Sequence, residues 1–178
     1  MAGKLGLRRG EYGILTLHRP SNVDDQDKLA LIVEKLCRIA ESAALVFPIH
    51  PRTRDRLQRF GLLTRLESNG NVEALEPLGY IEFMSLVLDC RFALTDSGGI
   101  QEETSYLGIP CLTLRDNTER PVTVTVGTNR LIQAESLDEE VLRVLETGRG
   151  ERPVVPLWDG ATAGRVAASL RRHGMGRG

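Results

Sequence analysis

The chain has 178 residues and a formal net charge of −1, with 41% of its residues apolar and 26% charged. This size suits one globular domain with a proper core, and the near-neutral charge favours neither nucleic acid nor an anionic membrane as a partner. No apolar run reaches the roughly 18 residues that span a bilayer, so no membrane segment is expected.

The three cysteines, Cys37, Cys90 and Cys111, are widely spaced, and each lies in an apolar run. They form no Cys-x-x-Cys pair and have no histidine at metal-ligand spacing, so no metal site is expected. We interpret them as buried free thiols in a reducing compartment. Because the first ten residues also lack the apolar core of a signal peptide, the sequence predicts a cytoplasmic protein.

Short apolar runs alternate with longer helical patterns along the first half of the chain. After the first run, Asp24 or Asp25 can cap a helix whose apolar residues recur at helical spacing as far as Ala40. A polar helix over 52–60 should end at Gly61. The predicted strands are residues 13–17, 44–49 and 71–75, with a polar loop at 18–25.

The same alternation continues in the second half. Gly108-Ile-Pro110 should end the helix that follows the fourth strand, and a Gly/Pro-rich segment occupies 148–156. The predicted strands are 92–95, 111–114 and 129–132. The predicted helices are 81–89, 100–107, 137–146 and 161–172, and the first of them is expected to be largely buried. A polar loop is expected at 115–128 and a fraying Gly/Arg tail at the end.

The strands are apolar throughout rather than alternating, which is typical of a parallel sheet that is covered on both faces. Right-handed crossovers then give an α/β, Rossmann-like, doubly wound fold. We expect one domain over residues 1–178, with its core at 10–147, a linker at 148–160 and a C-terminal helix at 161–173. Ligands bind such sheets beyond the carboxyl ends of the strands. The unusual polar segments follow those ends, at 18–22, 50–52, 96–99 and 115–121.

The turn Asp96-Ser97-Gly98-Gly99 joins the fourth strand directly to a helix. Such a turn points backbone N–H groups and the positive end of the helix dipole outward, and Ser97 adds a hydroxyl donor. The two glycines let a phosphate approach the backbone closely, or they serve only the dihedral angles of a tight turn. The turn by itself leaves both interpretations open.

Charged residues follow this turn and the fifth strand. We expect Glu102 and Glu103 in the first turn of the helix, where one of them can reach two ribose hydroxyls, or both offset the helix dipole. Arg115 and Arg120 follow the fifth strand, where planar guanidinium groups suit a diphosphate. The alternative for that segment is a solvated polar loop.

His18 and His50 each end a strand. A single histidine is more often a structural hydrogen-bonding residue, but two at equivalent strand ends favour an active-site histidine. Arg19, Asp96 and Arg115 belong to the same edge of the sheet and are further candidates to line a site.

Several strings of residues along the chain are distinctive. They are Thr16-Leu-His-Arg-Pro-Ser-Asn-Val23, Pro48-Ile-His-Pro51, Leu94-Thr-Asp-Ser-Gly-Gly-Ile-Gln-Glu-Glu103, Arg115-Asp-Asn-Thr-Glu-Arg-Pro121, Gly127-Thr-Asn-Arg130 and Trp158-Asp-Gly160. Over residues 10–172 the chain resembles the bacterial non-hydrolysing UDP-N-acetylglucosamine 2-epimerases. The resemblance implies the C-terminal half of a GT-B-like enzyme, in which two Rossmann-like domains hold the nucleotide in the cleft between them.

The resemblance also implies roles for individual residues. In that family the matching turn and arginine lie on the phosphates of UDP, the matching glutamate holds the ribose, and a phenylalanine packs near the uracil. His18 matches a histidine that is counted among the catalytic residues, and the positions that match the UDP-binding ones are Phe83, Ser97, Gly98, Gly99, Glu103 and Arg120.

The implied reaction inverts carbon 2 of UDP-GlcNAc to give UDP-ManNAc for polysaccharide biosynthesis. UDP leaves by anti elimination to give 2-acetamidoglucal and then adds back, with no redox cofactor and no metal. The departing diphosphate needs guanidinium and helix-terminal amides, and the proton at carbon 2 needs positioned acid and base groups. Full-length members are expected to form homodimers.

Two features depart from the family pattern. The family's chains are longer, and their N-terminal domain carries the acid–base carboxylates, for which only Asp24, Asp25 and Asp96 are conceivable substitutes here. Pro20-Ser21 stands where many members have Arg-Glu, in a region that, with the position of His50, binds regulatory UDP-GlcNAc in some members. This difference argues against such regulation.

We therefore expect a UDP-binding half that is inactive alone, with its N-terminal domain missing or supplied as a separate polypeptide. The alternatives are a non-catalytic UDP-sugar-binding module and one half of a GT-B glycosyltransferase. In GT-B proteins the last helix packs across the N-terminal domain. Val166, Ala167 and Leu170 should therefore be exposed here, and the helix should self-associate or fray.

Overall fold

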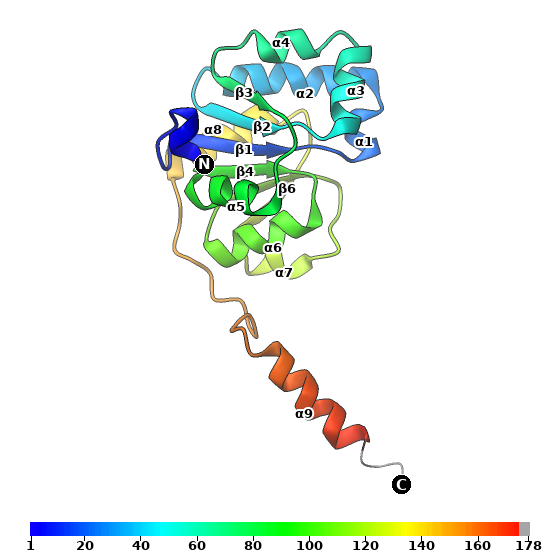
Figure 1. The fold of residues 1–178 in the computed structure, drawn as a ribbon, viewed down its shortest axis with the longest axis vertical. Coiled ribbons are helices and arrows are strands. Elements are labelled where there is room, and N and C mark those ends of the chain that lie inside the picture. Colours follow the sequence, from blue (N-terminus) through cyan, green and yellow to red (C-terminus); the bar gives the residue numbers. More distant parts are fainter. Residues whose placement is uncertain (175–178) are drawn as a thin grey trace.

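A six-stranded, all-parallel sheet forms the centre of the computed structural model, which describes residues 1–174 (Figure 1). The strand order β3-β2-β1-β4-β5-β6 is that of a doubly wound Rossmann-like fold, so the predicted fold class is confirmed. The predicted fraying tail began at residue 173; His173 and Gly174 instead belong to the last helix, and residues 175–178 lie outside the described part of the chain. The strands are β1 (Tyr12–Thr16), β2 (Ala44–Pro48), β3 (Val72–Leu75), β4 (Phe92–Thr95), β5 (Cys111–Leu114) and β6 (Asn129–Ile132).

Helices connect these strands, and two of them correct the sequence prediction. The segments predicted as polar loops at 18–25 and 115–128 each contain a short helix that begins with a proline, at Pro20 and at Pro121. Proline suits the first helical position, because its fixed φ is helical and its missing N–H is not needed there. The helices are η1 (Ala2–Leu5), α1 (Pro20–Val23), α2 (Gln26–Ile39), α3 (Pro51–Arg59), α4 (Leu63–Glu67), α5 (Tyr80–Asp89), α6 (Gly98–Leu107), α7 (Pro121–Thr125), α8 (Leu137–Thr147) and α9 (Thr162–Gly174).

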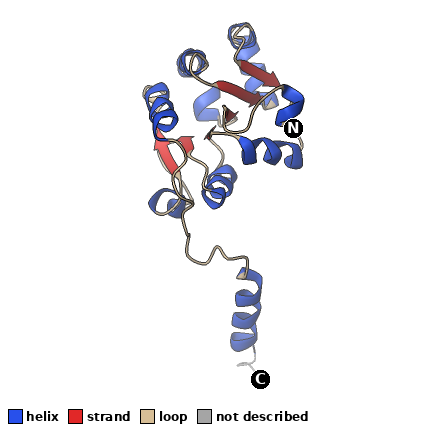
Figure 2. Ribbon diagram, turned by 90° about the vertical axis from the view of Figure 1, so that its left-hand side faces the viewer, coloured by secondary structure: helices blue, strands red, loops and turns tan. Residues whose placement is uncertain are grey.

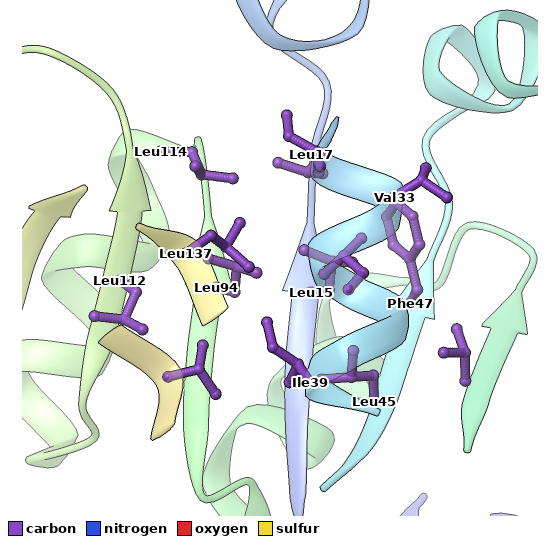
Figure 3. Close-up of a cluster of buried hydrophobic side chains, with 14 of the residues drawn as sticks. Leu15, Leu17, Val33, Ile39, Leu45, Phe47, Leu94, Leu112, Leu114 and Leu137 are labelled. Atoms are coloured by element: carbon purple, nitrogen blue, oxygen red, sulfur yellow. The ribbon is translucent and has the colours of Figure 1, made fainter. Parts of the chain in front are cut away.

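The helices cover both faces of the sheet, as the turned view in Figure 2 shows. On one face α2 and α8 pack on the sheet together with residues of α3 and α4, and Lys35 of α2 forms a 2.8 Å ion pair with Asp138 of α8. On the other face η1, α5 and α6 pack against a smaller buried cluster. Figure 3 shows the larger cluster, which includes Leu15, Leu17, Val33, Ile39, Leu45, Phe47, Leu94, Leu112, Leu114 and Leu137.

Helix α5 is less buried than its sequence predicts. Leu86 and Val87 are buried against the sheet, but Ile81 is 78% exposed and Leu88 is 48% exposed. Only one side of α5 lies on the sheet, where Tyr12 of β1 donates a 2.6 Å hydrogen bond to the carbonyl of Leu86. The apolar residues on the other sides of α5 therefore face outward.

All three cysteines are free thiols, but they are not equally buried. Cys90 and Cys111 are buried, and this burial raises the pKa of Cys90 to about 12 and that of Cys111 to about 11. Cys37 was expected to be buried and is only half-buried, because it packs at the margin of the larger cluster.

The C-terminal segment leaves the body of the domain (Figure 1). Its first part is anchored, since Val155 is buried and the guanidinium of Arg152 lies 4.2 Å from the ring centre of Tyr106. Beyond it α9 stands apart, and Val166 and Leu170 are exposed, as predicted. The helix is continuous to Gly174, so the alternative of a frayed helix is wrong for this segment, and self-association stays a prediction. Within residues 1–174, no helix combines the length and the apolar character needed to cross a membrane.

Candidate functional site

The strand order reverses between β1 and β4, at the centre of the sheet. Thr16 pairs with Thr95, so the two neighbouring strands end at the same level and bring His18 and Asp96 together. In open parallel sheets this reversal is where ligands bind. A cavity of about 240 Å³ opens there, lined by Thr16, Leu17, His18, Pro48, His50, Pro77, Leu78, Phe83, Ser97 and Ile100.

Asp96 is completely buried and holds the loop that follows β1. Its carboxylate accepts hydrogen bonds from the backbone N–H groups of His18 (3.0 Å) and Arg19 (2.8 Å) and from the side-chain amide of Asn22 (3.2 Å). It also lies 3.0 Å from Nδ1 of His18. Asp96 therefore fixes the position of the His18 ring and leaves Nε2 as the nitrogen available to a ligand.

The two groups also perturb each other's protonation. Burial acts to raise the pKa of Asp96, but the hydrogen bonds from the His18 ring and from the backbone amides of Arg19 and His18 outweigh it, so the pKa is lowered. The hydrogen bond to Asp96 raises the pKa of His18, against the opposing effect of its own burial. The pair therefore favours a protonated histidine beside an ionised carboxylate.

The other two aspartates proposed as substitute acid–base groups have structural partners. Asp25 caps α2 by accepting a 2.9 Å hydrogen bond from the backbone N–H of Lys28. Asp24 forms ion pairs with Arg52 and Arg56. Neither lines the cavity at the switch point.

The glycine turn after β4 is open to a ligand. Helix α6 begins at Gly98, and the side chain of Ser97, its N-cap residue, makes no capping hydrogen bond. Neither Gly98 nor Gly99 has a positive φ, and a Cβ added at either would meet no atom within 4 Å. The dihedral-angle explanation for these glycines is therefore wrong. The turn leaves helix N–H groups without a side-chain cap and with free space in front of the backbone, as an anion site requires.

The two glutamates of α6 lie past its first turn, because the helix starts two residues earlier than expected. Compensation of the helix dipole is strongest in the first turn, so it does not explain them. Glu102 pairs with Arg120 at 3.0 Å. Glu103 accepts a 3.0 Å hydrogen bond from the hydroxyl of Tyr80 on one oxygen, and its buried Oε2 has no partner among the described residues. A buried oxygen in this state is a candidate acceptor for a ligand hydroxyl.

The two loop arginines have different surroundings. Arg120 is nearly half exposed and reaches α6 through its ion pair with Glu102. The guanidinium of Arg115 is 7% exposed and donates to both carboxylate oxygens of Glu119, at 2.7 and 2.8 Å. The hydrogen bond from Arg115 lowers the pKa of Glu119 to about 2. Arg120 therefore contacts α6, the helix that follows the glycine turn, whereas Arg115 is paired within its own loop.

The remaining candidates occupy the edges of the site. Nε of Arg19 donates a 2.9 Å hydrogen bond to the backbone carbonyl of Asp96. The ring centre of His50 lies 5.6 Å from that of His18, and its Nδ1 accepts from the N–H of Arg52 at the start of α3. Phe83 lines the cavity together with Leu78 and Ile100. Within residues 1–174 no group of three His, Cys, Asp or Glu side chains is placed to hold a metal ion.

Three residues near the site were not named as individual candidates, although Asn22 and Gln101 lie in segments that the sequence had singled out. Asn22 is buried and bridges Asp96 to the carbonyl of Leu114. Tyr80 orients Glu103, and Gln101 is fully buried behind the glycine turn. The available signal was weak: each is a polar side chain within an otherwise apolar or loop segment, and its partner is distant in sequence.

Comparison with known proteins identifies the family. A family model described as UDP-N-acetylglucosamine 2-epimerase matches residues 2–171. The curated UDP-N-acetylglucosamine 2-epimerase of Methanocaldococcus jannaschii is 51% identical over 124 residues, which are 68% of this chain and 34% of that protein. The structure of M. jannaschii UDP-GlcNAc 2-epimerase in complex with UDP-GlcNAc and UDP matches with a TM-score of 0.79 and 42% identity, over 90% of this chain and 45% of that chain.

A bacterial structure is also similar. The UDP-GlcNAc 2-epimerase of Neisseria meningitidis, bound to UDP-GlcNAc, matches with a TM-score of 0.73 and 29% identity, over 92% of this chain and 45% of that chain. The chain thus spans less than half the length of these proteins. Since the family model covers nearly every residue, including the glycine turn and Arg120, the chain belongs to the UDP-N-acetylglucosamine 2-epimerase family.

Proposed function

We propose that this chain is the UDP-binding half of a UDP-N-acetylglucosamine 2-epimerase, an isomerase, and that it is inactive without an N-terminal domain. The observation that carries the proposal is the uncapped start of α6 at the switch point of the sheet, where two glycines leave open space, on the helix whose Glu102 pairs with Arg120. Helix-terminal amides and a guanidinium together suit a diphosphate. Membership of the family suggests that the ligand also carries uridine and N-acetylglucosamine.

In the proposed complex the diphosphate lies on Ser97, Gly98 and Gly99, and Arg120 exchanges its glutamate partner for phosphate oxygens. The ribose hydroxyls donate to Glu103, whose buried Oε2 has no other partner among residues 1–174. The uracil packs near Phe83, which lines the cavity. This arrangement places the sugar beside His18.

The proposed reaction has two steps. A base removes the proton at carbon 2 of the sugar while the bond from carbon 1 to the diphosphate oxygen breaks, which gives a glucal and UDP. UDP then adds back to carbon 1 as carbon 2 receives a proton on the opposite face. We propose that Arg120, the α6 amides and protonated His18 stabilise the negative charge that develops on departing UDP. Fixed donors that point at developing charge lower the barrier.

The groups that move the proton at carbon 2 belong, in this proposal, to the missing domain. Asp24 and Asp25 are engaged in an ion pair and a helix cap, and Asp96 serves to orient His18. The presence of the His18–Asp96 pair favours an epimerase half over a module that only binds UDP-sugars. Membership of the family favours it over half of a glycosyltransferase.

The proposal extends to the organisation of the protein. We propose one nucleotide-sugar-binding domain with a core at 10–147, a linker at 148–160 and a C-terminal helix at 161–173. The exposed apolar side of α9 supports the proposal that another protein surface packs against it. That surface is either an N-terminal domain or polypeptide, or a second copy in a homodimer. The free thiols support a reducing, cytoplasmic location.

Replacing Arg120 by alanine tests the proposed diphosphate site. We expect UDP to bind the unmodified chain and to bind Arg120→Ala roughly tenfold to a hundredfold more weakly, since a hydrogen bond to a charged group is lost. Calorimetric titration with UDP measures both affinities. Arg143→Ala is the matched control, because Arg143 also pairs with a glutamate but lies on α8. Equal affinities in all three chains would contradict the proposal.

Alanine at Gly98 or Gly99 should separate folding from binding. The free space predicts that either change raises the free energy of unfolding, by up to about 1 kcal/mol, because glycine is a poor helix former. The added methyl group should nevertheless weaken UDP binding, since it occupies the space of the phosphate. Gly164→Ala is the control: it lies in the first turn of α9, also has free space, and should leave UDP affinity unchanged. Unaltered affinity in both test variants would show that phosphate does not approach this turn.

A further inference from the structure

A buried polar network lies behind the glycine turn, and the proposed reaction assigns it no role. Its centre is Gln101, which is fully buried in the first turn of α6. The Nε2 of Gln101 donates a 3.1 Å hydrogen bond to the carbonyl of Ser97. Its Oε1 accepts hydrogen bonds from the hydroxyl of Thr118 (2.6 Å) and from the side-chain amide of Asn129 (3.0 Å). One side chain thus contacts the turn, the arginine loop and the sheet.

The arginine loop is held through Thr118. The same hydroxyl that donates to Gln101 accepts a 3.0 Å hydrogen bond from the backbone N–H of Arg120. Glu102 adds a second link, since it pairs with the guanidinium of Arg120 from the exposed side of α6. The backbone of the loop is therefore tied to the inside of α6 and its arginine to the outside.

The sheet anchors the other end of the network. The side-chain oxygen of Asn129 in β6 accepts from Thr113 of β5 at 2.6 Å, and its Nδ2 lies 3.1 Å from the hydroxyl of Thr123 in α7. Asn129, Thr113 and Thr123 are all buried. Buried hydrogen-bonding groups are costly to leave unpaired, so a network with these partners is rigid.

We propose that Gln101 is a positioning residue, which together with Thr118 and Asn129 fixes the Thr118–Arg120 segment relative to the Ser97–Gly99 turn. The diphosphate then meets helix amides and a loop backbone that are already in place, and only the Arg120 side chain has to move from Glu102 to the phosphates. This inference rests on the proposed function for the identity of the ligand. The contacts themselves do not depend on it.

Only an amide side chain meets all these demands at position 101. A glutamate lacks the donor for the carbonyl of Ser97. A leucine has neither the NH2 nor the oxygen of the amide, so it pairs with none of the three partners. Because Gln101 is fully buried, its replacement endangers the fold. The half-buried Thr118 allows the same contact to be removed from the loop side.

The test compares Thr118→Val with Thr118→Ser in the 178-residue chain. Valine keeps the shape of threonine and removes both hydrogen bonds, whereas serine keeps the hydroxyl. We expect the valine variant to bind UDP roughly threefold to tenfold more weakly, in line with the loss of hydrogen bonds between neutral groups. Its backbone N–H groups at residues 118–120, 122 and 123 should exchange hydrogen faster, and the serine variant should match the unmodified chain in both measurements.

The two measurements separate the inference from the proposed function. Unchanged amide exchange in the valine variant would overturn the inference, whatever the affinity for UDP. Faster exchange with unchanged UDP affinity would overturn the positioning role in binding. An unmodified chain that binds no UDP would contradict the proposed function, and exchange alone would then decide whether the network fixes the segment. A lower melting temperature shared by the valine and serine variants would indicate a packing effect and count against the hydrogen bonds.

Discussion

Replacing Asp96 by alanine should destabilise the chain by about 3–5 kcal/mol, because the donors around a buried carboxylate would lose their acceptor. The backbone amides of His18 and Arg19 and the side chain of Asn22 have their hydrogen bonds to this group. Unfolding in urea gives the free energy. Asp24→Ala is the matched control, since Asp24 is also paired but at the surface, and we expect a far smaller loss.

Asp96→Asn, which keeps the shape and removes the charge, should lower the pKa of His18. The raised pKa of His18 means that its contribution to stability is complete below its unfolded pKa and is lost as pH rises through the folded pKa. The lowered pKa of Asp96 means that its contribution is present above its unfolded pKa and is lost as pH falls through the folded pKa. The stability difference between the unmodified chain and this variant should therefore be largest between pH 3.8 and 6.5, the ordinary pKa values of the two groups.

Two measurements check this pH dependence. Urea unfolding at a series of pH values gives the stability difference, and the NMR titration of the His18 ring gives its pKa directly. A difference that does not vary with pH, or an unchanged His18 titration in the asparagine variant, would show that the two groups are not electrostatically coupled.

Truncation of Phe92 to alanine should also cost about 3–5 kcal/mol, because a large, fully buried side chain would be replaced by a cavity. The ring lies over Gly13, its partner in the register of β1 and β4. A Cβ added at Gly13 would overlap that ring, with Cε2 at 2.6 Å and Cε1 at 2.8 Å. Gly13→Ala should therefore destabilise the chain by about 1–3 kcal/mol through overpacking.

The two changes are expected to be coupled. In Phe92→Leu the smaller side chain leaves room for a methyl group, so the double variant Gly13→Ala/Phe92→Leu should lose less stability than the sum of the single variants. If the losses of stability in the single variants simply add in the double variant, the Phe92 ring is not the reason for glycine at position 13. Because the same strand pair positions His18 beside Asp96, Gly13→Ala should also shift the NMR signals of the His18 ring.

Much of the architecture follows from local sequence. All six strands were predicted, and β1, β2, β4 and β5 are mainly apolar runs, whereas the edge strands β3 and β6 contain Glu73 and Arg130. Asp25 caps α2, as one of the two predicted candidates. The short helices α1 and α7 were not predicted, although Pro20 and Pro121 marked their first positions. Helices of four and five residues do not repeat an apolar position often enough to show a helical period.

The sequence alone also indicated which segments carry the site, since the polar residues follow the ends of the strands. It left open whether Gly98 and Gly99 serve the turn or a ligand, because the same letters suit both. The tertiary structure shows an ordinary φ and empty space at each glycine, which removes the dihedral-angle explanation and supports the proposed phosphate site. It likewise separates Arg120, beside α6, from Arg115, which is engaged by Glu119.

Local composition therefore determined the α/β class, the order of the elements and the edge of the sheet where the polar residues gather. Tertiary structure decided which of these residues meet: His18 is 78 residues from Asp96, and Gln101 is 28 residues from Asn129. The physical reason is that apolar periodicity reports burial, whereas a hydrogen-bond partner is set by strand order and register. Those depend on how the whole chain packs, and no short segment encodes them.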